Sequence, residues 1–228
     1  MYYFLYLCLV ECIFWLILFY FARLPGFRRE MLFTSLIGLV SGWFSPLYIG
    51  IYWNPTIFYY IRVFGIAFDI ETFIFGFSFF GVAAGITSQF FGRNIIPNQS
   101  RRYLSYLPIL IFYPFVILFV GVFLAPRYAG IITDLTFGII LGTIFTVRKD
   151  LSYVALTGGA IFAIQYCILL GMGFLVFPNF FQSWNQSELC GIFLCNLPIE
   201  EIIFAFLYGA MGAVAYKFIF SYRMGKRV

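Results

Sequence analysis

The chain has no histidine and few charged residues. Among its 228 residues, Asp, Glu, Lys and Arg together make up only 10%. The absence of histidine removes the commonest general base of enzymes and argues against a zinc or haem site, since histidine is a frequent ligand of both. A charged fraction far below the roughly 25% of soluble domains excludes an ordinary soluble domain.

Nucleotide-binding and dithiol motifs are also missing. No GxGxxG and no CxxC occurs in the sequence, so a bound dinucleotide or a redox-active cysteine pair has no support, and we expect no cofactor. The basic residues that give the net charge of +5 lie in short predicted loops, so nucleic acid is not expected as a partner. Cys190 and Cys195 share one predicted loop and would be able to pair if that loop faces an oxidising compartment.

Apolar residues dominate and recur in long runs. They make up 63% of the chain, and runs of about 20 residues have the length that crosses roughly 30 Å of hydrocarbon. The pattern predicts an all-α integral membrane protein, a single membrane domain over residues 1–228. Glu11 interrupts the first run and no basic segment precedes it, so we expect this span to be retained rather than cleaved as a signal peptide. The seven predicted spans are residues 2–22, 31–52, 66–91, 104–125, 128–147, 151–177 and 197–221.

The distribution of basic residues predicts the orientation. With seven spans, 12 of the 14 Lys and Arg residues fall on one side of the membrane, counting Lys217 near that end of the last span. Because cytoplasmic loops carry the excess of Lys and Arg, we expect a multi-pass protein of the cell membrane with the N-terminus outside and the C-terminus in the cytoplasm.

Two parts of the chain share three landmarks in the same order. IETFIFGF, which begins at Ile70, matches IEEIIFAF, which begins at Ile199, and a Trp-Asn pair precedes each stretch. A basic pair followed by an acid opens the span before each Trp-Asn pair. The landmarks predict two parallel three-helix repeats, at about 1–92 and 128–222, joined by a linker helix at about 104–125. Such repeats are related by a pseudo-two-fold axis along the membrane normal.

The stretch NLPIEE places Glu200 and Glu201 at the start of the last apolar run. One interpretation is a helix start, because proline suits the first turn and acids there complement the helix dipole. The other is a functional site, because ionisable groups at membrane depth are costly and an acid, Glu71, recurs at the matching place in the first repeat. In an apolar cleft between the repeats, desolvation and like-charge repulsion favour a protonated carboxyl. A protonated acid in a dry aromatic cavity is suited to protonating a carbon-carbon double bond, and aromatic faces stabilise the resulting cation.

The motif P-x-E-E at Pro198–Glu201, in a chain of two three-helix halves, resembles the membrane-integral lycopene cyclase domain family. Members of this family occur as two small subunits or as one fused chain. The resemblance implies an intramolecular lyase or isomerase that closes a ring at the end of a linear carotene by protonation, ring closure through a carbocation and loss of a proton. It implies no net redox change and no cofactor.

The first repeat departs from this pattern. It has Asp69-Ile70-Glu71-Thr72, so the proline and the second glutamate are missing. Either Asp69 replaces the lost carboxylate or this half is degenerate. The resulting candidate site has two groups of residues. The candidate catalytic acids are Glu71, Glu200, Glu201 and Asp69, and the candidate substrate-binding residues are Trp53, Asn54, Trp184, Asn185, Phe75 and Phe204.

Two further acids lie inside predicted spans, Glu11 and Asp134. Each would be able to relay protons, but a structural pairing is the preferred prediction for both.

Two other functions remain open. SWEET-type sugar transporters share the plan of three, one and three helices, although the middles of these spans offer few polar groups to a sugar. A subunit that binds a lipid or isoprenoid without chemistry is the third possibility. On the cyclase reading, the partners are an apolar carotenoid or other isoprenoid drawn from the bilayer, the lipid itself, and, in one arrangement, a second copy of the chain.

Overall fold

The computed structural model describes residues 3–21, 26–91, 93–97, 128–177 and 179–227. Within these residues, five helices are long and apolar enough to cross a membrane. They agree with five of the predicted spans to within a few residues, because an uninterrupted apolar run leaves a helix as the only way to satisfy its backbone in hydrocarbon. The predicted linker helix at 104–125 lies outside the described residues. The five helices are α1 (Tyr3–Phe21), α4 (Ile70–Phe91), α6 (Ala129–Val147), α7 (Ser152–Val176) and α8 (Ile199–Ile219).

The predicted span 31–52 is not one continuous α-helix. It consists of α2 (Phe27–Leu39), the 3-10 segment η1 (Val40–Phe44) and the short α3 (Ser45–Tyr48). Pro46 lies in the first turn of α3, where its missing N–H is tolerated, and a proline in the interior of a longer helix would break the hydrogen-bond ladder. The helical part ends at Tyr48, and Gly50 with a φ of 85° turns the chain back.

Two β-hairpins, which the sequence did not predict, precede α4 and α8. β1 (Tyr60–Val63) pairs with β2 (Ile66–Asp69), and β4 (Phe193–Leu194) pairs with β5 (Leu197–Pro198). Each hairpin turns through two residues that both have positive φ, namely Phe64-Gly65 and Cys195-Asn196. This is the backbone of a type I′ turn, whose twist matches that of the strands it joins. The helices therefore begin at residues 70 and 199, not at 66 and 197 as predicted.

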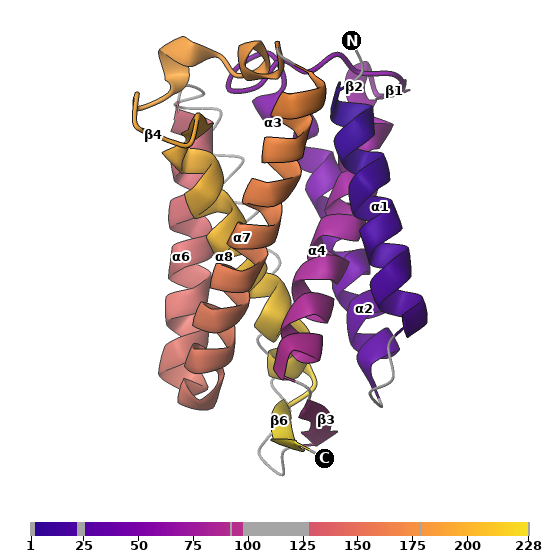
Figure 1. Cartoon of the computed structure of the whole chain (residues 1–228), viewed down its shortest axis with the longest axis vertical. Coiled ribbons are helices and arrows are strands. Elements are labelled where there is room, and N and C mark those ends of the chain that lie inside the picture. The colour runs from indigo at the N-terminus through magenta and orange to yellow at the C-terminus, as the bar shows by residue number, and fades with distance from the viewer. Residues whose placement is uncertain (1–2, 22–25, 92, 98–127, 178, 228) are drawn as a thin grey trace.

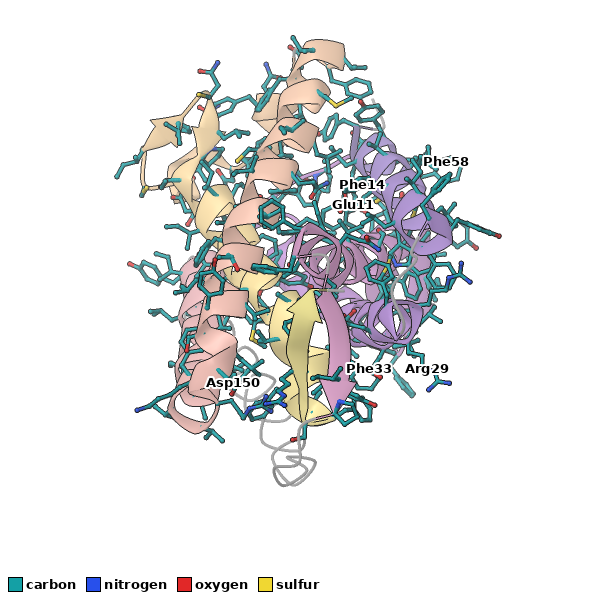
Figure 2. All side chains as sticks on the ribbon, turned by 60° about the horizontal axis from the view of Figure 1, so that its bottom comes forward. Glu11, Phe14, Arg29, Phe33, Phe58 and Asp150 are labelled. Atoms are coloured by element: carbon teal, nitrogen blue, oxygen red, sulfur yellow. The ribbon has the colours of Figure 1, made fainter. Side chains whose placement is uncertain are left out.

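Helices α4 and α8 run in the same direction through the bundle (Figure 1). Both begin at the end that carries the two hairpins. At the opposite end, β3 (Arg93–Pro97) follows α4 and pairs with β6 (Tyr222–Arg227), which follows α8. The two chain ends lie at opposite ends of the bundle in the same view. Arg29 and Asp150, from the two basic-acidic landmarks, lie at the end that Figure 2 brings forward, which is the β3–β6 end.

Short one-turn segments connect these elements. The 3-10 segment η4 (Lys149–Leu151) joins α6 to α7, and η5 (Phe180–Ser183) and η6 (Gln186–Glu188) follow α7. At η4, Arg148 forms a bidentate ion pair with Asp150 and donates to the carbonyl of Tyr222 at 2.9 Å. This contact ties the α6–α7 corner to β6.

The helices pack closely where glycines meet neighbouring backbone. Gly38 of α2 and Gly76 of α4 face one another, and a Cβ added to either would overlap the carbonyl oxygen of the other. A Cβ on Gly209 of α8 would lie 2.6 Å from the Cβ of Phe162 on α7. Glycine at these positions allows the helices to approach closely.

Candidate functional site

An elongated cavity lies between the helices. Its volume is about 330 Å³, and nearly half of the residues that line it are aromatic. Along α8 the lining runs from Glu200 and Glu201 at one end to Phe218 and Ile219 at the other, about 28 Å at 1.5 Å per residue. The cavity is polar at the hairpin end and apolar along the rest of its length.

Glu201 is the best-anchored acid at the polar end. Its carboxylate is buried, with 8% of the residue exposed, and accepts three hydrogen bonds. Trp184 Nε1 donates to Oε1 at 2.8 Å, Tyr52 Oη donates to Oε1 at 3.2 Å, and Tyr166 Oη donates to Oε2 at 3.0 Å. The donors come from the segment after η5, the turn after α3 and helix α7, so Glu201 ties three separate parts of the chain together. Donors of this kind stabilise a carboxylate that would otherwise be costly to bury.

Tyr52 lies in the turn beyond α3, outside the five candidate spans. Burial, and next the negative charges of Glu201 and Glu200, raise the pKa of its hydroxyl above the ordinary phenol value. Tyr52 therefore keeps its proton and acts as a hydrogen-bond donor toward Glu201.

Glu200 presents a different environment. Its Oε1 accepts the backbone N–H of Cys190 at 2.6 Å, while Oε2 is buried and has no hydrogen-bond partner among the described residues. Both glutamates lie in the first turn of α8, after Pro198 at the N-cap, and both line the cavity. The helix-start and functional-site interpretations of NLPIEE are therefore compatible in one geometry.

The acids of the first repeat do not line this cavity. Asp69 is fully buried, and its Oδ1 accepts the N–H of Thr72 at 2.7 Å, as a helix-capping aspartate does. Glu71 Oε1 accepts the backbone N–H of Phe58, which precedes the β1–β2 hairpin. The residue of this motif that reaches the cavity is Thr72, at the position that Glu201 occupies in the second repeat. The structure thus separates Glu71 and Asp69 from Glu200 and Glu201.

The two Trp-Asn pairs come together at the hairpin end. Trp53 and Trp184 form an antiparallel backbone bridge, flanked by hydrogen bonds from Asn54 N–H to Ser183 O at 2.7 Å and from Asn185 N–H to Tyr52 O at 3.0 Å. Both indoles line the cavity, whereas neither asparagine does. The Asn185 side chain instead fixes the neighbouring backbone, since it donates to Ile51 O at 3.0 Å.

Aromatic side chains form much of the remaining wall. Phe75 and Phe204, both predicted to contact substrate, line the cavity on α4 and α8. Phe79 lies between them, stacked on Phe75 with centroids 4.7 Å apart and on Phe204 at 6.1 Å. Phe204 lies one turn beyond Glu200 and Glu201 on α8, so this group of rings is close to the polar end.

The two intramembrane acids differ in position. Glu11 of α1, labelled in Figure 2, is fully buried. Its Oε2 accepts a hydrogen bond from Gln165 Nε2 of α7 at 2.9 Å. This is the structural pairing that the sequence favours for it. Asp134 of α6 instead lines the cavity, and its charge interacts with those of Glu200 and Glu201. The sequence favours a structural role for Asp134, and the only indication of a face shared with cavity residues is its spacing to Phe137 at i+3 and to Gly130 at i−4.

Cys190 and Cys195 are free and exposed in this structure, Cys195 being one of the two turn residues of the β4–β5 hairpin.

Five long apolar helices, with an aromatic cavity that carries carboxyl groups at one end, are consistent with a multi-pass membrane protein. The family model described as lycopene cyclase matches residues 128–219. This match confirms the family resemblance for the segment from α6 to α8, which contains Asp134, Trp184, Glu200 and Glu201. No curated protein and no solved structure matches the chain.

Proposed function

We propose that the protein is an intramembrane carotenoid cyclase, which closes a ring at the end of a linear, lycopene-type polyene without net redox change. The observation that carries the proposal is the pair Glu200 and Glu201 at the polar end of a long aromatic cavity. An apolar cavity of this kind suits a polyene, with its end group at the acids and its chain along α8. The lycopene cyclase match over residues 128–219 supports the same substrate class.

Glu200 is the proton donor in this proposal. A carboxylate oxygen that is buried without a donor is costly when charged, and a proton on Oε2 removes that cost. Glu200 lines the cavity and its Oε2 has no partner among the described residues, so a proton there is free to move to the terminal double bond of the substrate. The N–H of Cys190 at Oε1 fixes the carboxyl group and stabilises the carboxylate that remains after transfer.

Glu201 acts as a fixed negative charge. Three donors from Trp184, Tyr52 and Tyr166 satisfy its oxygens and hold them in place. A preorganised carboxylate beside the reacting carbons stabilises the cation that forms on protonation, without reorganisation during the reaction. The faces of Phe75, Phe79 and Phe204 add cation–π stabilisation and exclude water that would capture the cation.

The first-repeat acids take a positioning role. Asp69 caps α4 and Glu71 fixes the chain at Phe58, so together they hold the start of α4 and the hairpin before it. This assignment favours the degenerate alternative for the first motif, with the reaction run from the second repeat.

We further propose seven membrane crossings in two parallel halves, with the hairpin end outside and the β3–β6 end in the cytoplasm. The matching hairpins before α4 and α8 and the reciprocal bonds around Trp53 and Trp184 support a pseudo-two-fold axis between the halves. Arg29 and Arg148, at the β3–β6 end, support that orientation through the positive-inside rule.

Expression in a bacterial host that accumulates lycopene tests the function. Wild-type protein is expected to convert lycopene to monocyclic or bicyclic carotenes, separable by chromatography. An inactive control with both Glu200→Gln and Glu201→Gln should leave lycopene unchanged at equal membrane levels. If the wild type yields no cyclic carotene in several such hosts, the cyclase proposal fails, and transport or binding of an isoprenoid becomes the better hypothesis.

A further inference from the structure

Asp134 belongs to a continuous stripe of α6 that faces the cavity. The stripe has helical spacing and consists of Gly130, Thr133, Asp134, Phe137, Ile140 and Ile144, all of which line the cavity. Residues on the other face of the same helix, such as Ile131 and Leu135, are exposed on the outside of the bundle. The backbone of α6 therefore directs Asp134 inward by the same periodicity that directs Phe137.

The surroundings of Asp134 place it with the two glutamates. It lies within electrostatic range of the carboxyl groups of Glu200 and Glu201 and of the hydroxyls of Tyr48 and Tyr52. Its neighbour Thr133 shares a hydrogen bond with Tyr48, which fixes the first turns of α6 against α3. Asp134 thus approaches the polar end of the cavity from a different helix than Glu200 and Glu201.

The three carboxyl groups differ in how their oxygens are used. Glu201 accepts three hydrogen bonds, and Glu200 is fixed through one oxygen by Cys190. No hydrogen bond to the Asp134 carboxylate is found among residues 3–21, 26–91, 93–97, 128–177 and 179–227. A carboxylate without donors is a stronger base than one that accepts three.

On the basis of the proposed cyclase function, we infer that Asp134 is a further catalytic residue, the base that removes a proton from the cyclised cation and thereby sets the position of the ring double bond. The reaction balances without another reactant. The proton on Glu200 Oε2 adds to the terminal C=C, the π electrons of a second C=C form the ring C–C bond, and a proton beside the new cation passes to an Asp134 carboxylate oxygen. The electrons of that C–H bond become the ring C=C, and Asp134 then returns its proton to Glu200.

Substitutions at Asp134, expressed in the lycopene-accumulating host, test this role. Asp134→Asn is expected to lower the yield of cyclic carotene by roughly 10² or more, the usual cost of a lost general base. The residual product should show a changed ratio of ring double-bond isomers and a share of ring alcohols, formed when water captures the cation. Asp134→Glu keeps a base but moves it by one methylene, so it should retain most of the yield with an altered isomer ratio.

Glu11→Gln serves as the matched control. Glu11 is another buried membrane acid, but it does not line the cavity and contacts Gln165. This variant should give the wild-type yield and isomer ratio. A merely structural role for Asp134 would change yield in proportion to protein level and leave the isomer ratio unchanged.

Two results would overturn the inference. If Asp134→Asn reaches wild-type yield and isomer ratio while wild type cyclises lycopene, Asp134 is not the base although the cyclase proposal stands. If Asp134→Asn does not accumulate in the membrane, Asp134→Glu decides, and an unchanged isomer ratio in that variant refutes the assignment. Absence of cyclisation by the wild type would instead refute the proposed function and this inference together.

Discussion

Trp53 and Trp184 face one another across an antiparallel backbone bridge, with equivalent hydrogen bonds on either side of it. Their indole groups nevertheless have different environments. Trp184 Nε1 donates to Glu201 at 2.8 Å, whereas Trp53 Nε1 is buried with no partner among the described residues, and its ring packs edge-on against Phe4 at 4.4 Å. The difference follows from the sequence, because the residue that corresponds to Glu201 in the first half is Thr72. The hydrogen-bonded acid site is therefore built on one half.

This asymmetry predicts unequal effects of two substitutions, Glu201→Gln in the second half and Glu71→Gln in the first. Glu201→Gln removes the negative charge beside the reacting carbons and is expected to lower cyclase activity by about 10² to 10³, as for loss of a preorganised electrostatic group. Glu71→Gln keeps an oxygen that accepts the N–H of Phe58 and lies outside the cavity lining, so we expect activity within about tenfold of wild type. Carotene yields per amount of membrane protein measure both effects. Equal loss in the two variants would show that the first repeat also supplies an acid.

The donors to Glu201 give a second prediction. Tyr166→Phe and Trp184→Phe each remove one hydrogen bond to a buried charged group, which is worth about 1.5–3 kcal/mol. Activity should fall by roughly 10-fold to 100-fold in each variant. Phe180→Leu is a suitable control, because Phe180 also lines the cavity and packs on Trp184 at 5.0 Å but donates nothing. A loss in Phe180→Leu as large as in Trp184→Phe would assign the effect to packing rather than to the hydrogen bond.

The crossing of α2 and α4 gives a prediction on stability. Gly38→Ala or Gly76→Ala would place a methyl group into the facing backbone, and overpacking of this kind costs about 1–3 kcal/mol. Both variants should lose monodispersity in detergent at a lower temperature than wild type. Gly171→Ala of α7 is the matched control, because an added Cβ there meets no atom within 4 Å. A temperature for Gly38→Ala as high as that for Gly171→Ala would contradict the close approach of the two helices.

The sequence was sufficient to place the long helices, but it did not predict the hairpins that precede α4 and α8. The apolar runs predict α1, α6 and α7 to within two residues, because hydrocarbon imposes both length and helicity. Residues 66–69 and 197–198 read as the start of helices, since a short apolar strand and a helix turn have the same composition. Phe64 and Cys195, both at positive φ, are not typical hairpin-turn residues, so only the second residue of each turn, Gly65 or Asn196, carries a local turn signal.

The sequence predicted many residues of the candidate site but not which of them line the cavity. The adjacent acids, the Trp-Asn pairs and Phe75 and Phe204 could be found from the repeat and the motif. The direction of each side chain could not, because it depends on which helix faces which. Asp134 enters the cavity through the packing of α6 against α8, and Glu71 turns away from it through its bond to Phe58. No local pattern distinguishes these two outcomes.

The last prediction concerns Lys217, a buried cation that the proposed reaction does not use. Lys217 of α8 is fully buried, pairs with Glu30 of α2, and also donates to Ala213 O at 2.8 Å and to Ser88 Oγ of α4 at 3.3 Å. Ser88 in turn donates to Glu30 Oε2 at 2.9 Å, so the cluster joins three helices near the β3–β6 end.

Lys217→Met leaves Glu30 buried without its cation and should lower the free energy of unfolding by about 3–5 kcal/mol, because the buried charge has lost its partner. The double variant Lys217→Met with Glu30→Gln removes both charges and should recover much of that loss, and heating in detergent followed by size-exclusion chromatography measures it. Because the cluster is remote from Glu200, protein that remains folded should keep wild-type cyclase activity. Equal destabilisation by the single and double changes would mean that packing around Lys217, rather than the ion pair, stabilises this end of the bundle.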